Sequence, residues 1–196
     1  MTTILTQSLN DKILRLIKAV EDDKINDVMD ITNRGSSLDV INGIPINDNG
    51  VQQPSPLHVA VELNRIDILK DLLEMGADPD IGANKNIYYP ALETTFGVTP
   101  LFIAIYMSNS KAVQLLLTNG ADINHHIQNY PSHDISDYYE TMYLSFALSI
   151  APQEPYEMYK IIDYILTNYQ PKEDIYKTVE YPTIIGTIEQ GLYELV

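Results

Sequence analysis

The chain has 196 residues, enough for one ordinary domain with a sizeable core. Its 27 acidic and 12 basic side chains give a net charge of −15, which argues against nucleic acid and anionic membranes as partners and favours a basic protein partner, although acidity also simply promotes solubility. It has no cysteine, which excludes disulfides and thiolate metal sites, and no apolar run of the length that spans a membrane.

Residues 9–35 have the spacing of two short amphipathic helices, with apolar residues recurring on one face of each. The first stripe consists of Ile13, Leu14, Ile17 and Val20, and the second of Ile25, Val28, Met29 and Ile31. The other side of the first helix carries Lys12, Arg15, Lys18, Glu21 and Asp22, which is typical of a unit that caps a repeat array. Residues 36–54 are rich in Gly, Asn, Asp and Pro and predict a hairpin-like connection.

The stretch 97–124 predicts two further short helices joined by a tight turn. Thr99 is a suitable N-cap, and Pro100 suits the first helical position. Two apolar stripes follow, one of Leu101, Ala104 and Ile105 and the other of Ala112, Val113, Leu116 and Leu117. Gly120 then ends the second helix, where a left-handed residue is favoured.

Residues 55–78 repeat this pattern, because 21 positions separate Ser55 from Gly76 and also Thr99 from Gly120. Helices this short cannot bury their apolar faces alone, so they need copies to stack on. We therefore expect Leu72, Leu73, Leu116 and Leu117 to be buried between units. The copy begins Ser55-Pro56-Leu57-His58-Val59-Ala60 and ends Leu72-Leu73-Glu74-Met75-Gly76-Ala77-Asp78. These residues resemble the ankyrin repeat family, whose unit carries T-P-L-H-x-A and L-L-x-x-G-A-D.

The resemblance implies an all-α ankyrin-repeat solenoid of four to five helix-turn-helix units in a single domain, 1–196. The units are 9–35, 55–78, 99–124, 142–170 and a partial 181–196, and Ala19 falls where Ala60 and Ala104 fall. The connections 79–96 and 125–141 are longer than is usual for the family, so we expect two enlarged finger loops. The fourth unit has a lengthened turn at 151–155, and its second helix carries Ile161, Ile162, Ile165 and Leu166. The last unit is either a half-repeat cap or the start of a segment cut from a longer protein.

Two positions depart from the family pattern. The family's glycine in the inter-helix turn is Asn64 in one unit and Ser108 in the next. Serine tolerates the left-handed region less well than asparagine, so we expect the turn at Ser108 to be opened or differently shaped. The family's histidine is kept as His58, which we interpret as structural, and is replaced by Phe102, where its hydrogen bonds between units are expected to be missing.

The sequence contains no recognisable catalytic motif, neither G-x-S-x-G nor a Gly-rich phosphate loop nor H-E-x-x-H. His125, His126, His133 and Asp134 are of metal-ligand type, but adjacent histidines in a long loop do not preset a tetrahedral site, and a polar loop is the favoured interpretation. Asp134, Asp137 and Glu140 could share a helical face for acid–base work, yet a solvated acidic face is favoured. We therefore predict no enzyme activity, no metal and no cofactor.

The chain has 14 tyrosines and no tryptophan, and five of the tyrosines fall in the two long connections: Tyr88, Tyr89, Tyr130, Tyr138 and Tyr139. Tyrosine offers a large contact area with few torsions, which suits a binding surface. These rings could equally anchor the long loops to their own units.

The resemblance also implies where a partner would bind, because ankyrin proteins use the finger tips and the exposed side of each first helix. Carried over by register, these helix positions are Glu62 and Leu63 in one unit and Tyr106 and Met107 in the next. Large apolar residues at exposed positions form patches that usually bind something. Residues 121–196 hold 12 acidic and 3 basic side chains, which suits a partner rich in lysine or arginine.

We therefore predict a monomeric, non-catalytic module that binds a protein partner through its concave face and tyrosine-rich fingers, with no nucleic acid or membrane partner. Examples are a bacterial or viral stoichiometric inhibitor, such as an immunity protein, and an effector that targets a host protein. The alternative is a substrate-recruiting fragment of a larger enzyme whose catalytic domain lies outside this chain. Residues 1–6 lack the pattern of a secretory signal, so we expect a cytoplasmic protein or one delivered into a host cell without a cleaved signal.

Overall fold

The computed structural model describes residues 2–33, 38–82, 98–123 and 155–168. The helices in these ranges are α1 (Thr2–Glu21), α2 (Ile25–Asn33), α3 (Leu38–Ile41), α4 (Pro56–Glu62), α5 (Ile66–Glu74), α6 (Pro100–Tyr106), α7 (Ser110–Thr118) and α9 (Pro155–Asn168). The described part of the chain holds no extended strand, only one isolated antiparallel bridge between Ile46 and Gln52. The prediction of an all-α repeat solenoid is confirmed.

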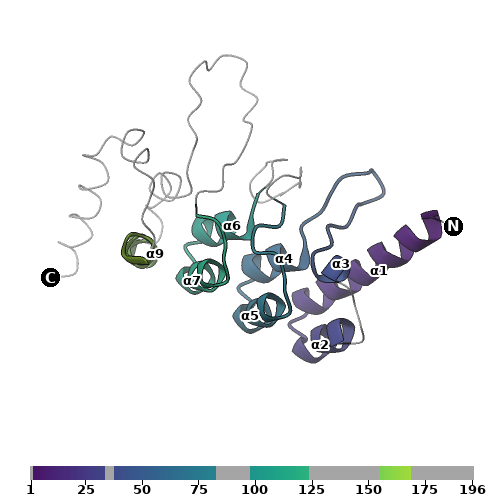
Figure 1. The fold of residues 1–196 in the computed structure, drawn as a ribbon, viewed down its shortest axis with the longest axis horizontal. Coiled ribbons are helices and arrows are strands. Elements are labelled where there is room, and N and C mark those ends of the chain that lie inside the picture. The colour runs from purple at the N-terminus through teal and green to yellow at the C-terminus, as the bar shows by residue number, and fades with distance from the viewer. Residues whose placement is uncertain (1, 34–37, 83–97, 124–154, 169–196) are drawn as a thin grey trace, which may run out of the picture.

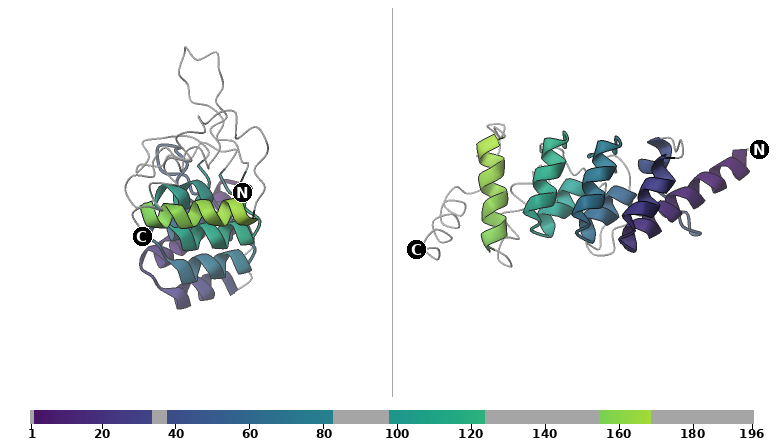
Figure 2. Two further views of the ribbon diagram at one scale, coloured as in Figure 1. Left: turned by 90° about the vertical axis from the view of Figure 1, so that its left-hand side faces the viewer. Right: turned by 90° about the horizontal axis from the view of Figure 1, so that it is seen from below.

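The helices stack as antiparallel pairs in two layers (Figure 1). One layer contains α1, α4 and α6 and the other contains α2, α5 and α7, and each helix contacts its neighbour in the layer and its partner in the pair. Helix α9 packs against α7 and extends the row, as the view from below shows (Figure 2). We call each pair a unit and the edge formed by the turns between paired helices the turn edge.

The three pairs turn in the same way. A residue with positive φ follows the first helix of each pair: Asp23 at 56°, Asn64 at 54° and Ser108 at 52°. The next backbone N–H then donates to an alanine carbonyl five residues earlier: Lys24 to Ala19, Arg65 to Ala60 and Asn109 to Ala104, at 2.9, 2.8 and 2.8 Å. The predicted register of Ala19 is confirmed. The prediction that the Ser108 turn is opened is wrong, because this hydrogen bond holds serine in the left-handed region.

Replacing Ser108 by glycine should stabilise the fold by about 0.5 kcal/mol. The relief of a left-handed non-glycine residue, roughly 1–2 kcal/mol, slightly exceeds the backbone entropy that glycine loses on folding, about 0.5–1 kcal/mol. Urea unfolding would measure the change, with Asn64→Gly as the matched control, for which we expect a smaller gain because asparagine tolerates this region better. A destabilised Ser108→Gly variant would show that the hydroxyl itself supports the turn.

The core lies between the layers and between successive units. Leu72, Leu73, Leu116 and Leu117 are 0, 6, 0 and 3 % exposed, which confirms their predicted burial. In the first pair the prediction is partly wrong: Leu14 is 45 % exposed, whereas Leu16, which the stripe omitted, is fully buried. The contacts of α1 with both α2 and α4 select its buried face, and that face runs through Ile13, Leu16 and Val20. The second stripe keeps Val28 buried but leaves Ile25 and Met29 exposed.

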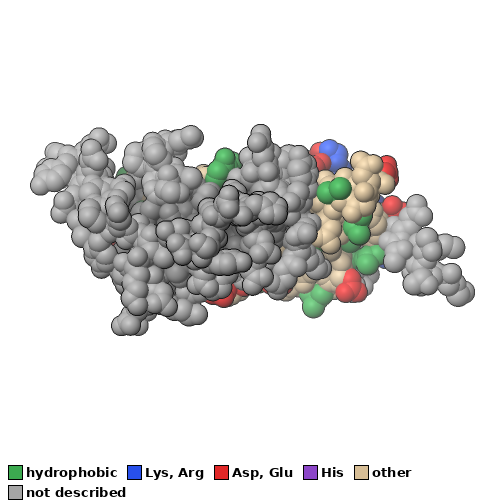
Figure 3. Space-filling model, turned by 90° about the horizontal axis from the view of Figure 1, so that it is seen from above, with side chains coloured by type: hydrophobic (Ala, Val, Ile, Leu, Met, Phe, Trp, Pro, Cys, Tyr) green, Lys and Arg blue, Asp and Glu red, His purple; other side chains and the backbone are tan. Residues whose placement is uncertain are grey.

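Residues 38–54 form the predicted hairpin-like connection. Asn47 donates its N–H to the Val51 carbonyl at 3.0 Å, Gln53 donates to Pro45 at 2.8 Å, and Gly50 takes a φ of 76° at the tip. Seen from above, the described part of the upper face shows hydrophobic side chains among polar ones toward the N-terminal end (Figure 3). The exposed hydrophobic residues of the hairpin are Leu38, Ile46 and Val51. Residues 83–96 and 125–141 of the two expected enlarged fingers lie outside the described residues, as does the unit predicted at 181–196.

Helix α9 is the predicted second helix of the fourth unit. Ile161, Ile162 and Ile165 are buried as expected, while the side chain of Leu166 is outside the description. Asn168 donates its amide to the Tyr164 carbonyl at 2.8 Å, as Asn119 does to Leu115 at 2.8 Å. Placing Pro155 in the turn was wrong, because the helix begins there and has 14 residues against 9 in α7. The longer helix adds a wall beside the turn edge.

Candidate interaction surface

The turn edge exposes the residues that the sequence predicted for α4 and α6. Leu63 and Met107 directly follow the last residue of each helix and are 41 and 49 % exposed, Tyr106 is 39 % exposed, and Glu62 is half-buried. These positions lie at the end of each helix away from its N-cap, where the connections 38–54 and 83–97 enter. Tyr88, Tyr89, Tyr130, Tyr138 and Tyr139 lie outside the described residues.

A hollow of about 420 Å³ opens on the turn edge between the turns of the second and third pairs and the first turns of α9. Its lining consists of Val61, Glu62, Asn64, Met107, Ser108, Asn109, Ser110, Lys111, Glu157 and Lys160. The two turns that form its floor are linked, because Asn109 donates its amide to the Asn64 side-chain oxygen at 2.9 Å. Two of the four residues predicted for α4 and α6, Glu62 and Met107, therefore line one concave site.

The first turns of α9 close one side of this turn-edge hollow. Glu157 accepts hydrogen bonds from Lys160 and from the Ser110 hydroxyl, both at 2.6 Å. These two bonds, with that from Lys160 the larger cause, hold the pKa of Glu157 below its ordinary value. Lys160 also lies 4.2 Å from the centre of the Tyr156 ring. Sequence reasoning missed Glu157 and Lys160, and the lengthened segment before Ile161 was the signal that could have found them.

His58 has the structural role that the sequence predicted. It is fully buried, and its Nδ1 lies 2.7 Å from the Ser55 hydroxyl, which caps the same helix. Its Nε2 lies 2.7 Å from the carbonyl oxygen of Val98 in the next unit. Burial lowers the pKa of His58 to about 4, against the smaller raising effect of the Val98 carbonyl, so the ring is neutral at pH 7. The phenyl ring of Phe102 has no hydrogen-bonding nitrogen for a corresponding bond.

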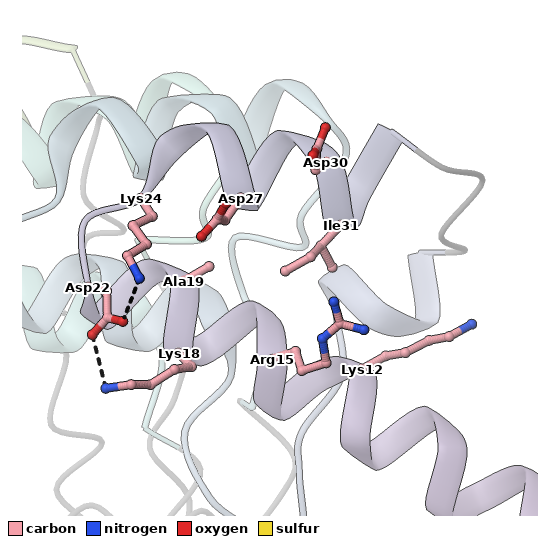
Figure 4. A pocket seen from close by; sticks show the side chains of 9 residues that line it. All are labelled: Lys12, Arg15, Lys18, Ala19, Asp22, Lys24, Asp27, Asp30 and Ile31. Carbon is pink, nitrogen blue, oxygen red and sulfur yellow. Dashed lines mark hydrogen bonds and ion pairs between the residues drawn. The ribbon is translucent and has the colours of Figure 1, made fainter.

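A second hollow, of about 590 Å³, lies at the open N-terminal end between α1 and α2 (Figure 4). Its lining consists of Lys12, Arg15, Lys18, Ala19, Asp22, Lys24, Asp27, Asp30 and Ile31. Asp22 forms ion pairs with Lys18 at 2.9 Å and with Lys24 at 3.3 Å. The position of Lys18 is taken in the next two pairs by Val59 and Ile103, which are buried. This end face is therefore the polar outer face that the sequence predicted.

Metal and membrane sites were also considered. Within residues 2–33, 38–82, 98–123 and 155–168, no group of three or more His, Cys, Asp or Glu side chains is placed to hold a metal ion. His125, His126, His133, Asp134, Asp137 and Glu140 fall outside these ranges. None of the described helices combines the length and the apolar character needed to cross a bilayer.

Comparisons with known proteins agree with this architecture. A family model described as ankyrin repeats (3 copies) matches residues 16–127, more than half of the chain. The chain is also 32 % identical over 119 residues to the Homo sapiens protein named transient receptor potential cation channel subfamily A member 1. That match covers 48 % of this chain and 10 % of the channel protein, so this chain spans only a small part of that relative's length. The chain belongs to the ankyrin repeat family, whose arrays are generally non-catalytic modules for protein–protein interaction.

Proposed function

We propose that this protein is a monomeric, non-catalytic module that binds a basic protein partner. Its binding face consists of Glu62, Leu63, Tyr106 and Met107 at the ends of α4 and α6, together with Tyr88, Tyr89, Tyr130, Tyr138 and Tyr139 of the long connections. One observation carries the proposal: Leu63, Tyr106 and Met107 are all exposed, on two units that pack directly against each other. Exposed large apolar side chains that gather in this way usually cover a partner's surface.

The charge of the chain supports a basic partner. The net charge is −15, and residues 121–196, which contain the second long connection, contribute 12 acidic against 3 basic side chains. A field of this sign accelerates the encounter with a surface rich in lysine and arginine, while the apolar and aromatic side chains supply the contact area. The division of labour is typical of interfaces whose charges set the rate and whose buried rings set the lifetime.

Two biological settings fit such a module. In the first, the protein occludes its partner stoichiometrically, as an immunity-type inhibitor of a toxin or as an effector acting on a host protein. In the second, the array recruits substrate for a catalytic domain that lies outside this chain. The human match favours the second setting in one respect, since it covers only 10 % of that relative, which shows that a related array can be part of a much longer protein.

Replacing both Tyr138 and Tyr139 by alanine should weaken binding of the partner by about 1–2 kcal/mol, the scale of interface hot spots. The partner would first be identified by affinity capture and mass spectrometry from the source organism. Its dissociation constant would then be measured by calorimetry for the parent chain, the double variant and a control, Met29→Ser, which alters an exposed methionine of α2.

The melting temperature separates binding from folding in this experiment. We expect it to be nearly the same in all three proteins, because rings on a binding face contribute little to the free protein. A double variant that melts much earlier but binds normally while folded would show that the two rings anchor the loop. The binding face would then lie elsewhere.

A further inference from the structure

The turn-edge hollow is bordered by apolar side chains from three successive parts of the array. Met107 lies in its lining and is 49 % exposed. Leu63 stands between the lining residues Glu62 and Asn64, and Tyr156 precedes the lining residue Glu157; they are 41 and 54 % exposed. Methionine adapts its shape to the group it covers, which suits it to contact with a partner's apolar side chain.

The polar groups of this hollow divide into committed and available ones. Glu157 is held by Lys160 and Ser110, and Asn109 is held by Asn64 and by its N-cap bond to Ala112. By contrast, the Glu62 carboxylate forms no ion pair with the described residues. In a chain whose long-range field attracts cations, this carboxylate is available to an incoming guanidinium or ammonium group.

Ser108 adds a second available group. It is held at a φ of 52°, where glycine would be less strained, and its side chain lines the hollow. Its hydroxyl makes no hydrogen bond with the described part of the chain. Sparsely populated backbone conformations of this kind are concentrated at binding sites. A serine retained at some cost in stability therefore offers a donor and acceptor to a ligand backbone.

We propose that the turn-edge hollow binds an extended peptide segment of the partner in which an arginine or lysine stands beside a large apolar residue. The cation pairs with Glu62, the apolar side chain packs on Met107 between Leu63 and Tyr156, and Ser108 hydrogen-bonds the peptide backbone. A hollow of about 420 Å³ holds a few side chains, whereas a helix is roughly 10–12 Å wide with its side chains. The inference rests on the proposed function and names the chemistry of the partner at this site.

Four labelled decapeptides on a glycine–serine frame test the recognition. Their two central positions carry Arg and Leu, Arg and Ser, Glu and Leu, or Glu and Ser, and binding to the full chain is followed by fluorescence anisotropy. We expect the peptide with Arg and Leu to bind at least about tenfold more tightly than the one with Glu and Ser, which corresponds to ~1.4 kcal/mol. Four equal affinities, or no binding at millimolar protein, would overturn the proposal.

Two variants assign the parts of the site. Glu62→Gln should reduce the preference for Arg over Glu and leave the preference for Leu over Ser unchanged, and Met107→Ser should do the reverse. The matched controls are Glu74→Gln, an exposed glutamate of α5, and Met29→Ser, an exposed methionine of α2, which should alter neither preference. Ser108→Gly should weaken the peptide while making the protein more stable.

The outcomes separate this inference from the proposed function. If the whole partner loses affinity on Tyr138→Ala with Tyr139→Ala but is unaffected by Glu62→Gln and Met107→Ser, the hollow is not the site and the proposed function stands. If the peptide preferences shift as expected while the tyrosine variant binds normally, the hollow is a site and the finger tyrosines are not. Amide shifts confined to residues 38–54 on peptide addition would contradict the proposal.

Discussion

Replacing Leu116 by alanine should lower the free energy of unfolding by about 2–5 kcal/mol, as core truncations to alanine do. Leu116 is fully buried in α7, which packs against α6, α5 and α9, so the cavity is enclosed on several sides. The loss also affects the interfaces between units, on which a repeat array depends because each unit contacts only its neighbours. Urea unfolding followed by circular dichroism would measure the change.

The control for Leu116→Ala is Leu63→Ala, in which the same atoms are removed from a side chain that is 41 % exposed. We expect a clearly smaller loss there, because part of the leucine surface is in water in both states. A loss of less than about 1 kcal/mol for Leu116→Ala would show that this stripe of α7 is not core.

Acidification from pH 7 to 4.5 should cost the protein about 2–3 kcal/mol through His58 alone. In the unfolded chain the imidazole has its ordinary pKa of 6.5, whereas burial lowers the pKa to about 4 in the folded state. Below 6.5 the unfolded state therefore binds a proton that the folded state refuses, and stability falls as the pH falls from 6.5 toward 4. Above 6.5 both states are neutral, and His58 contributes no pH dependence.

The comparison variant for this titration is His58→Phe, which places at this position the residue that the next unit carries as Phe102. It should be less stable at pH 7, because it loses the contacts to Ser55 and to the Val98 carbonyl. It should also lose less stability between pH 7 and 4.5 than the parent chain, by the amount that His58 contributes. Equal losses in the two proteins would mean that His58 titrates normally and is not buried neutral.

The ends of the central helices could be predicted from sequence because the interactions that fix them are local. The Thr99 hydroxyl accepts from the Phe102 N–H, Pro100 starts the helix, and Gly120 takes a φ of 93°, all within a few residues. The repeated spacing between Ser55 and Gly76 and between Thr99 and Gly120 then determined the register. That register in turn indicated which residues, Leu63, Tyr106 and Met107 among them, would be exposed at the ends of α4 and α6.

Tertiary packing decided what local spacing left open. Leu14 and Leu16 are both compatible with a helical stripe, and only the simultaneous contact of α1 with α2 and α4 makes Leu16 the buried one. Ser108 adopts the left-handed conformation because the two helices it joins must return against the same neighbours. The turn-edge hollow depends on a hydrogen bond between Ser110 and Glu157, which are 47 positions apart. No local pattern encodes such a distance, because it arises only when separate units of the array are stacked.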